Sequence, residues 1–107
     1  MKTFFTSVLF CTIFAFQQKG FADTVNGEKI FSANCSACHL GGNNVIMPDK
    51  NLKEDVLEAN GMKSQDAIIY QVTNGKNAMP AFGGRLSDSD VQDVAAYVLE
   101  QAGKGWD

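Results

Sequence analysis

Three residues that can bind a metal or form covalent bonds lie within five positions of one another. Cys35 and Cys38 are separated by two residues, and His39, the only histidine of the chain, follows directly. A C-x-x-C-H segment is compatible with a disulfide, half of a zinc site, a dithiol redox pair or an attachment site for c-type haem. These alternatives predict different proteins, so the remaining sequence must distinguish between them.

Three of the alternatives fit poorly. A disulfide across two residues closes a very short loop and gives little stabilisation. A thioredoxin-like dithiol belongs beside a strand–helix unit, which the sequence does not indicate. Zinc requires four ligands, more than this segment provides. We therefore favour one haem c per chain, bound through two thioethers by Cys35 and Cys38, with His39 as an axial iron ligand; a disulfide or dithiol remains the alternative.

Residues 1–22 have the layout of a secretory signal peptide, with a basic start, an apolar run of 13 residues at 4–16 and a polar end. Thirteen residues are too few to span a bilayer core of roughly 30 Å, which favours a cleaved signal over an anchor. Cleavage after Ala22 would place the small residues Gly20 and Ala22 at positions −3 and −1. We expect one mature domain, residues 23–107.

Removal of this leader would change the charge of the chain. The leader contains two lysines and no acidic residue, so seven basic and twelve acidic side chains would remain, with a net charge of −5. Such a surface argues against nucleic acid and stable membrane insertion, and suits either docking to a basic partner or solubility alone. A domain this small usually needs a covalent or metal staple, which haem would supply.

The periodicity of apolar residues predicts an all-α domain. Four helices are expected, over residues 26–38, 49–61, 64–75 and from Ser87 onward. Asp49 and Ser64 are the expected N-caps of the second and third helices. Ser87 and Asp90 have capping-box spacing, and apolar residues follow on one helical face at 91, 94, 95, 98 and 99. The apolar loops at 40–48 and 75–86 must cover something apolar.

A second iron ligand would separate an electron carrier from a gas-binding or peroxide-reactive protein. Three methionines of the mature chain are candidates. Met47 follows His39 by only eight residues, and Met62 lies in a turn without apolar neighbours. Met79 lies 40 residues after His39, in a loop between two helices, and Pro-Ala-Phe follows it. We therefore favour Met79, and methionine ligation raises the reduction potential.

The segments "NGEKIFSANCSACHLGGNNVIMPDK", "YQVTNGKNAMPAFGGRL" and "YVLEQAGKGW" resemble the cytochrome c6 family over nearly the whole mature chain. The resemblance implies a class I cytochrome c fold, with about four helices around one covalent haem and His39 and Met79 as axial ligands. It also implies a monomeric electron carrier, not an enzyme. Such a carrier takes one electron from the cytochrome b6f complex to photosystem I in the thylakoid lumen.

The resemblance assigns weaker roles to further residues. Gln71 matches a glutamine that influences the haem potential, and Arg85 matches an arginine near the face that docks with photosystem I. Gly27 and Phe31 match the place where the first helix crosses the last near Tyr97. From the residues alone, Gln71 can be buried against the haem, but a polar residue on a helix is more often solvated. Arg85 is equally compatible with pairing to a haem propionate or to a neighbouring acid.

Two other kinds of haem protein are alternatives to this carrier. A respiratory cytochrome c would donate to a terminal oxidase with the same iron ligands, whereas a haem peroxidase or gas-binding protein would leave the iron five-coordinate. The leader lacks a preceding Ser/Arg-rich transit peptide. The gene is therefore expected to be plastid-encoded or cyanobacterial.

Overall fold

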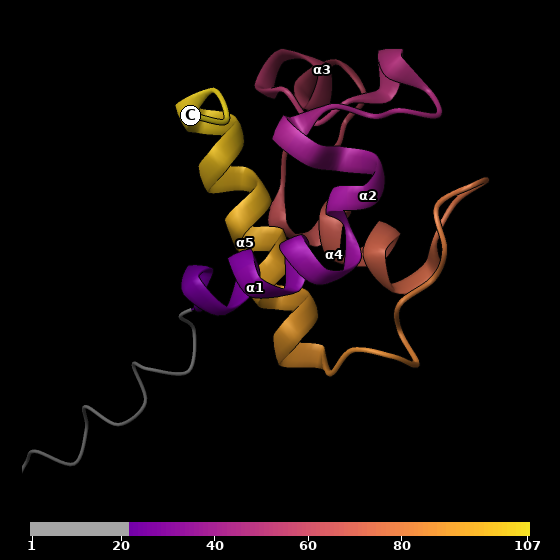
Figure 1. Cartoon of the computed structure of the whole chain (residues 1–107), viewed down its shortest axis with the longest axis vertical. Coiled ribbons are helices and arrows are strands. Elements are labelled where there is room, and N and C mark those ends of the chain that lie inside the picture. The colour runs from indigo at the N-terminus through magenta and orange to yellow at the C-terminus, as the bar shows by residue number, and fades with distance from the viewer. Residues whose placement is uncertain (1–21) are drawn as a thin grey trace, which may run out of the picture.

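The computed structural model describes residues 22–107, and these form a helical domain (Figure 1). The predicted leader, apart from Ala22, lies outside the described residues. Residues 22–107 contain no strand, only an isolated bridge between Lys76 and Met79. None of the helices in this range is long and apolar enough to cross a membrane. The elements are α1 (Thr24–Asn34), α2 (Ser36–His39), η2 (Leu40–Gly42), η3 (Pro48–Lys50), α3 (Glu54–Ala59), α4 (Gln65–Asn74) and α5 (Asp88–Lys104). The all-α prediction is confirmed.

The crossing of α1 and α5 organises the domain, and Figure 1 shows the two helices lying across one another. Gly27 makes this close approach possible. A Cβ atom at Gly27 would lie 2.2 Å from the carbonyl oxygen of Asp93 and 2.8 Å from Cβ of Tyr97. The first helix thus crosses the last at Gly27, as expected.

An aromatic cluster closes the same end of the domain. The ring of Phe31 lies 5.4 Å, centroid to centroid, from both Tyr97 and Trp106. The indole N–H of Trp106 donates to the carbonyl of Leu52 at 3.0 Å, and its ring lies against Gly42, where a Cβ atom would be 2.5 Å from the indole. Trp106 therefore fastens the segment between α2 and α3 to the C-terminal end of the chain.

The two later helices begin where their caps predict. The Ser64 hydroxyl accepts from the N–H of Ala67, and the Ser87 hydroxyl accepts from the N–H of Asp90, both at 3.1 Å. The predicted apolar face of α5 is buried, and Gly105, with φ of +79°, ends the helix in a left-handed conformation.

The first predicted helix is wrong at both ends. It begins at Thr24, capped by the Asp23 carboxylate, which accepts from the N–H groups of Val25 and Asn26. It ends at Asn34, because Cys35 (φ −116°) leaves the helical geometry while its N–H still bonds the Phe31 carbonyl. The turn α2 then starts in a new direction and carries the rest of the C-x-x-C-H segment.

The second predicted helix is shorter than expected, and Asp49 does not cap it. Pro48–Lys50 form a single 3₁₀ turn, after which Asn51 is extended. The Asn51 side chain donates to the Pro48 carbonyl and accepts from the Lys53 N–H, so local side-chain bonds compete with helix formation here. Helix α3 starts only at Glu54, where two acidic residues in the first turn favour the helix dipole.

The close crossing gives a first prediction. Gly27→Ala should lower the free energy of unfolding by about 3 kcal/mol, because the added methyl group would collide with the α5 backbone. Gly103→Ala is the matched control: Gly103 lies within α5 with nothing within 4 Å of an added Cβ, and alanine there should stabilise by up to about 1 kcal/mol. Urea unfolding of both variants measures this. Equal stability of the two variants would contradict the close approach.

Candidate functional site

A cavity of about 300 Å³ lies inside the domain, between the helices and the loop at 75–86. Most of its wall is apolar, and this part of the wall includes Phe31, Leu52, Leu57, Ile68, Val72, Phe82, Val94 and Val98. Protein interiors are close-packed and large voids are rare. A hollow of this size among core side chains therefore indicates a site for a bulky, largely apolar group.

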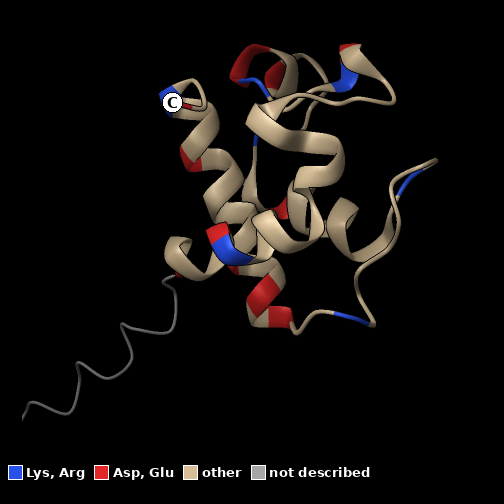
Figure 2. Ribbon diagram, in the orientation of Figure 1, with Lys and Arg blue, Asp and Glu red and all other residues tan. Residues whose placement is uncertain are grey.

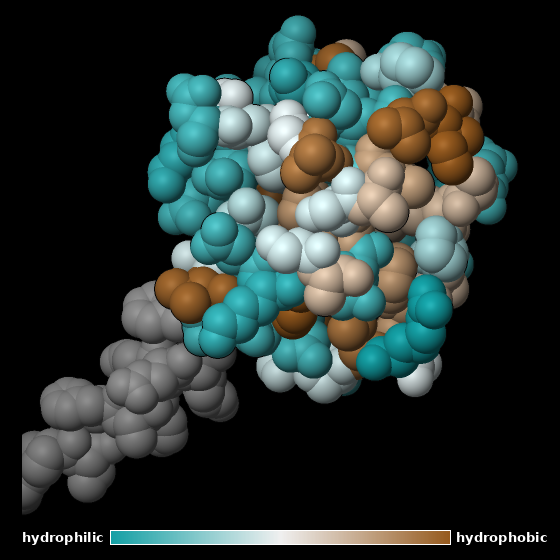
Figure 3. All heavy atoms as spheres, in the orientation of Figure 1, coloured by the Kyte–Doolittle hydropathy of each residue, from teal (hydrophilic) through white to brown (hydrophobic). Residues whose placement is uncertain are grey.

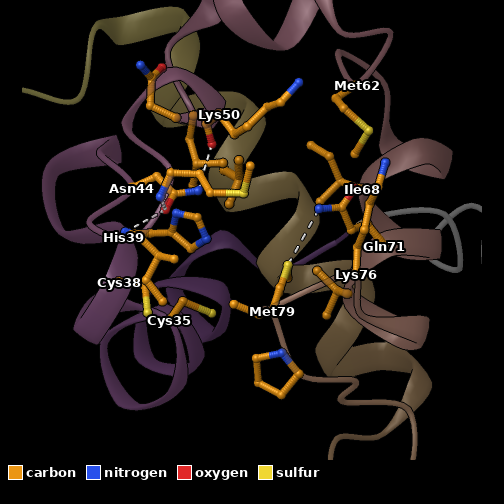
Figure 4. Close-up of a pocket in the computed structure, with 18 of the residues that line it drawn as sticks. Cys35, Cys38, His39, Asn44, Lys50, Met62, Ile68, Gln71, Lys76 and Met79 are labelled. Carbon is orange, nitrogen blue, oxygen red and sulfur yellow. Dashed lines mark hydrogen bonds between the residues drawn. The ribbon is translucent and has the colours of Figure 1, made fainter.

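The C-x-x-C-H segment forms one side of the cavity (Figure 4). The N–H groups of Cys38 and His39 both donate to the Cys35 carbonyl, at 3.1 and 2.9 Å, so a single turn holds all three residues. Both cysteines are free thiols. The structure thus brings these three side chains together at the cavity.

The imidazole of His39 is oriented by a backbone contact. Its Nδ1 lies 2.9 Å from the carbonyl oxygen of Asn43, which can only accept a hydrogen bond. Nδ1 therefore carries the proton, and Nε2 keeps a free lone pair. A metal-binding histidine is held in this way by its second nitrogen.

The thiol chemistry of Cys35 argues against a redox dithiol. Burial, and secondarily the neighbouring Cys38, raises the pKa of Cys35 to about 11. A dithiol oxidoreductase requires a cysteine whose pKa is lowered, so that the thiolate can attack a disulfide. The environment of Cys35 has the opposite effect.

Met79 faces this segment from the loop between α4 and α5. Lys76 and Met79 exchange two backbone hydrogen bonds of 2.9 and 3.0 Å, which close a tight turn. The turn depends on Gly75, whose φ is +73° and whose hypothetical Cβ would lie 2.7 Å from backbone atoms of Met79 and Ala81. The loop thus holds the half-buried Met79 side chain at the cavity.

Gln71 lies beside Met79, and this settles its location. Its side-chain amide donates from Nε2 to the Met79 sulfur at 3.6 Å, drawn as a dashed line in Figure 4. Gln71 is half-buried on α4 and lines the cavity. Of the two positions left open from the residues alone, solvent and cavity, the structure places Gln71 at the cavity.

Arg85 lies outside this group of residues. Its guanidinium is stacked over the ring of Phe82, 4.6 Å from the centroid. Residues 22–107 contain one ion pair, between Lys63 and Glu54. No acidic side chain in this range pairs with Arg85. Of the two pairings left open from the residues alone, the one of Arg85 with a neighbouring acid is therefore not present in this part of the chain.

Sequence reasoning missed some of the cavity wall. Met62 was expected to lack apolar neighbours, which is wrong: it packs against the core and lines the cavity. Asn44 and Lys50 also line it, and the Asn44 side chain donates to the Lys50 carbonyl. No pattern in the sequence pointed to these residues, because they reach the cavity through loop geometry.

Exposed apolar side chains lie in the segment that follows α2, which also lines the cavity. Leu40, Val45 and Ile46 are 69%, 66% and 56% exposed, and Ile46 also lines the cavity. Figure 3 shows a hydrophobic cluster over the loop that follows α2. Single exposed apolar residues are common, but a cluster beside a cavity indicates a contact surface.

Known proteins are similar to this chain in sequence and in fold. Residues 22–98 match a family model described as cytochrome c oxidase, cbb3-type, subunit III. Cytochrome c6 of Porphyra purpurea is 66% identical over 107 residues, covering 99% of this chain and 96% of that protein. Cytochrome c6 of Bumilleriopsis filiformis is 74% identical over 86 residues, covering 80% of this chain and all of that protein. The chain belongs to the cytochrome c6 family.

The solved structures agree with this assignment. Cytochrome c6 of the diatom Phaeodactylum tricornutum is 57% identical and superposes with a TM-score of 0.77, covering 79% of this chain and all of that chain. The expected class I cytochrome c fold is thereby confirmed. As a member of this family, the protein is an electron carrier and not an enzyme, and its cofactor is a c-type haem.

The residues present fit this cofactor. Two free thiols lie on one turn, a histidine offers an unprotonated Nε2, and a thioether lies across an apolar hollow. Cys35, Cys38, His39 and Met79 could therefore hold the haem.

Proposed function

We propose that the chain carries single electrons from the cytochrome b6f complex to photosystem I, through one covalently bound haem c between His39 and Met79. The observation that carries this proposal is the meeting of His39 and Met79 across the cavity beside two free thiols (Figure 4). When bound, the haem supplies a one-electron Fe(II)/Fe(III) couple.

Each residue of the site has one task in this proposal. Cys35 and Cys38 would form the two thioethers, and they lie on a single turn that would hold the group. His39 donates its Nε2 lone pair, and Asn43 prevents the imidazole from rotating. Met79, which lines the cavity across from this segment, would supply its thioether sulfur as a second ligand.

The apolar walls keep water away from the centre. Phe82, Val94 and Val98 are buried and face the cavity. A dry, close-packed surrounding has few dipoles that must reorient when the charge changes. The chain therefore supports rapid electron exchange without supplying a reacting group of its own.

Location follows from the leader. We propose that residues 1–22 direct export and are removed, which places residues 23–107 in the thylakoid lumen of a plastid or cyanobacterium. The Bumilleriopsis relative supports a removed leader, because its full length matches 86 of the 107 residues of this chain, one more than the 85 residues of 23–107. The gene is then plastid-encoded or cyanobacterial.

Docking uses the surface around the cavity mouth. The exposed Leu40, Val45 and Ile46 would provide an apolar contact. Figure 2 shows acidic residues on α3 and at the start of α5, and these would attract a partner with basic residues. Arg85, exposed on Phe82, would contribute to the photosystem I contact. The protein acts as a monomer.

The iron ligand is tested with the methionines of the cavity. Met79→Leu should abolish the weak red charge-transfer band of ferric Met-ligated haem and lower the reduction potential, because the thioether is lost. Met62→Leu is the matched control, since Met62 lines the same cavity, and it should keep both properties. Visible spectra and potentiometry measure this. A band that survives Met79→Leu and disappears with Met62→Leu would contradict the assignment.

Gln71 gives a prediction about the potential. Its N–H withdraws electron density from the Met79 sulfur and so disfavours Fe(III). Gln71→Leu should therefore lower the potential by about 40 mV, since a neutral hydrogen bond contributes about 1 kcal/mol and 59 mV is a tenfold change for one electron. Gln65→Leu, on the same helix but bonded to the Gln92 carbonyl, should leave the potential unchanged. A rise in the Gln71→Leu potential would refute this role.

The partner is tested by flash kinetics. The reduced protein should donate to photo-oxidised photosystem I, with a rate that falls as salt screens the acidic surface. Arg85→Gln should slow this donation and leave the visible spectrum unchanged. Donation to a terminal oxidase but not to photosystem I would instead support the respiratory alternative.

A further inference from the structure

Asp93 is a buried carboxylate outside the haem cavity. It is 9% exposed, and no other charged side chain among residues 22–107 is buried. Its Oδ1 accepts from the backbone N–H of Asp23, and its Oδ2 accepts from the side-chain amide of Asn26, both at 2.8 Å. Both donors are neutral, although a buried charge normally has a charged partner.

One of these donors changes its chemistry when the leader is removed. Cleavage after Ala22 breaks the peptide bond to the nitrogen of Asp23, and that nitrogen becomes a positively charged α-ammonium. It would lie at the position now 2.8 Å from the Asp93 carboxylate. A charge-assisted hydrogen bond is roughly twice as strong as a neutral one.

We propose that leader removal after Ala22 creates an ion pair between the new α-ammonium of Asp23 and the buried carboxylate of Asp93, which fastens α1 to α5 in the processed protein. This inference rests on the proposed signal peptide. The precursor keeps a neutral amide at Asp23 and therefore has the weaker contact between the two helices.

The surrounding charges decide whether an ammonium is favourable there. The N-terminus of α1 disfavours a cation through its dipole. Against this, the Asp23 carboxylate lies on the same turn, where it accepts from Val25 and Asn26. Asp90 adds a third carboxylate, 3.0 Å from the Asn26 amide, and this hydrogen bond lowers the pKa of Asp90. A cation among three carboxylates relieves their mutual repulsion.

The ion pair would lie at the crossing of α1 and α5, so it would stabilise the contact between these helices. Asp93 contributes its carbonyl to the close contact with Gly27 and its carboxylate to the contact with Asp23. The new ion pair therefore strengthens the same crossing that Gly27 allows. Helix α1 leads directly to Cys35, so the crossing also steadies the chain that carries the thiols.

The experiment compares two N-termini in two backgrounds, with all four proteins loaded with haem. One N-terminus is the free amine of Asp23. The other retains Ala22, which keeps the Asp23 N–H and moves the charge one residue away. Each is made with Asp93 and with Asp93→Asn. The clash of an asparagine amide with Asn26 is present with both N-termini, so it cancels in the double-mutant cycle.

The proposal predicts a dependence on Asp93. With Asp93, the free Asp23 terminus should raise the folding equilibrium constant about fivefold over the Ala22 form, the upper range for a partly exposed pair. With Asp93→Asn, the two termini should differ little. Asp90→Asn is the matched control, because it removes a charge from the same cluster without touching Asp23, and the fivefold effect should remain.

Two results would overturn the proposal. One is an equal effect of Ala22 with Asp93 and with Asp93→Asn; if the latter does not fold, equal urea unfolding of the two wild-type termini decides in the same way. The other is a mass spectrum showing that the native protein begins at a residue other than Asp23. Donation to photosystem I is measured on the same proteins. Its loss in all of them would overturn the proposed function and leave the coupling result intact.

Discussion

The structure depends on an apolar cavity that the chain cannot fill by itself. Core residues from α1, α4 and α5 surround it, and Phe31 and Val94 border it from helices that cross. In a domain of this size, few other apolar contacts are available to replace those lost around a void. The haem is therefore a structural part of the core as well as the redox group, and the fold and the function share one requirement.

The site is built from two chain segments, one arranged by local helical geometry and the other by the packing of a loop between two helices. Cys35, Cys38 and His39 lie on one turn, so local helical geometry arranges them. Met79 reaches the opposite side through a loop whose shape requires a left-handed Gly75. Gln71, on the helix before that loop, then meets the Met79 sulfur. The second half of the site thus exists only when α4, the loop and α5 are packed.

Local features could be predicted from the sequence, and long-range ones could not. The C-x-x-C-H motif, the caps at Ser64 and Ser87 and the apolar face of α5 follow from neighbouring residues. The single turn at Pro48–Lys50 results from competing local hydrogen bonds of Asn51, which periodicity does not report, and periodicity also does not report the change of backbone angles at Cys35. The burial of Met62 and the contact of Asp93 with Asp23, 70 positions away, depend on packing.

The account is tested most directly by making the chain without haem. The variant Cys35→Ala, Cys38→Ala removes both thiols proposed to attach the haem, and far-UV circular dichroism with urea titration measures the helix content and cooperativity of the haem-free protein. We predict that the haem-free chain loses most of its helical signal and its cooperative transition, because the cavity leaves the core incomplete. A haem-free chain with the helix content and unfolding midpoint of the haem-bound protein would contradict this.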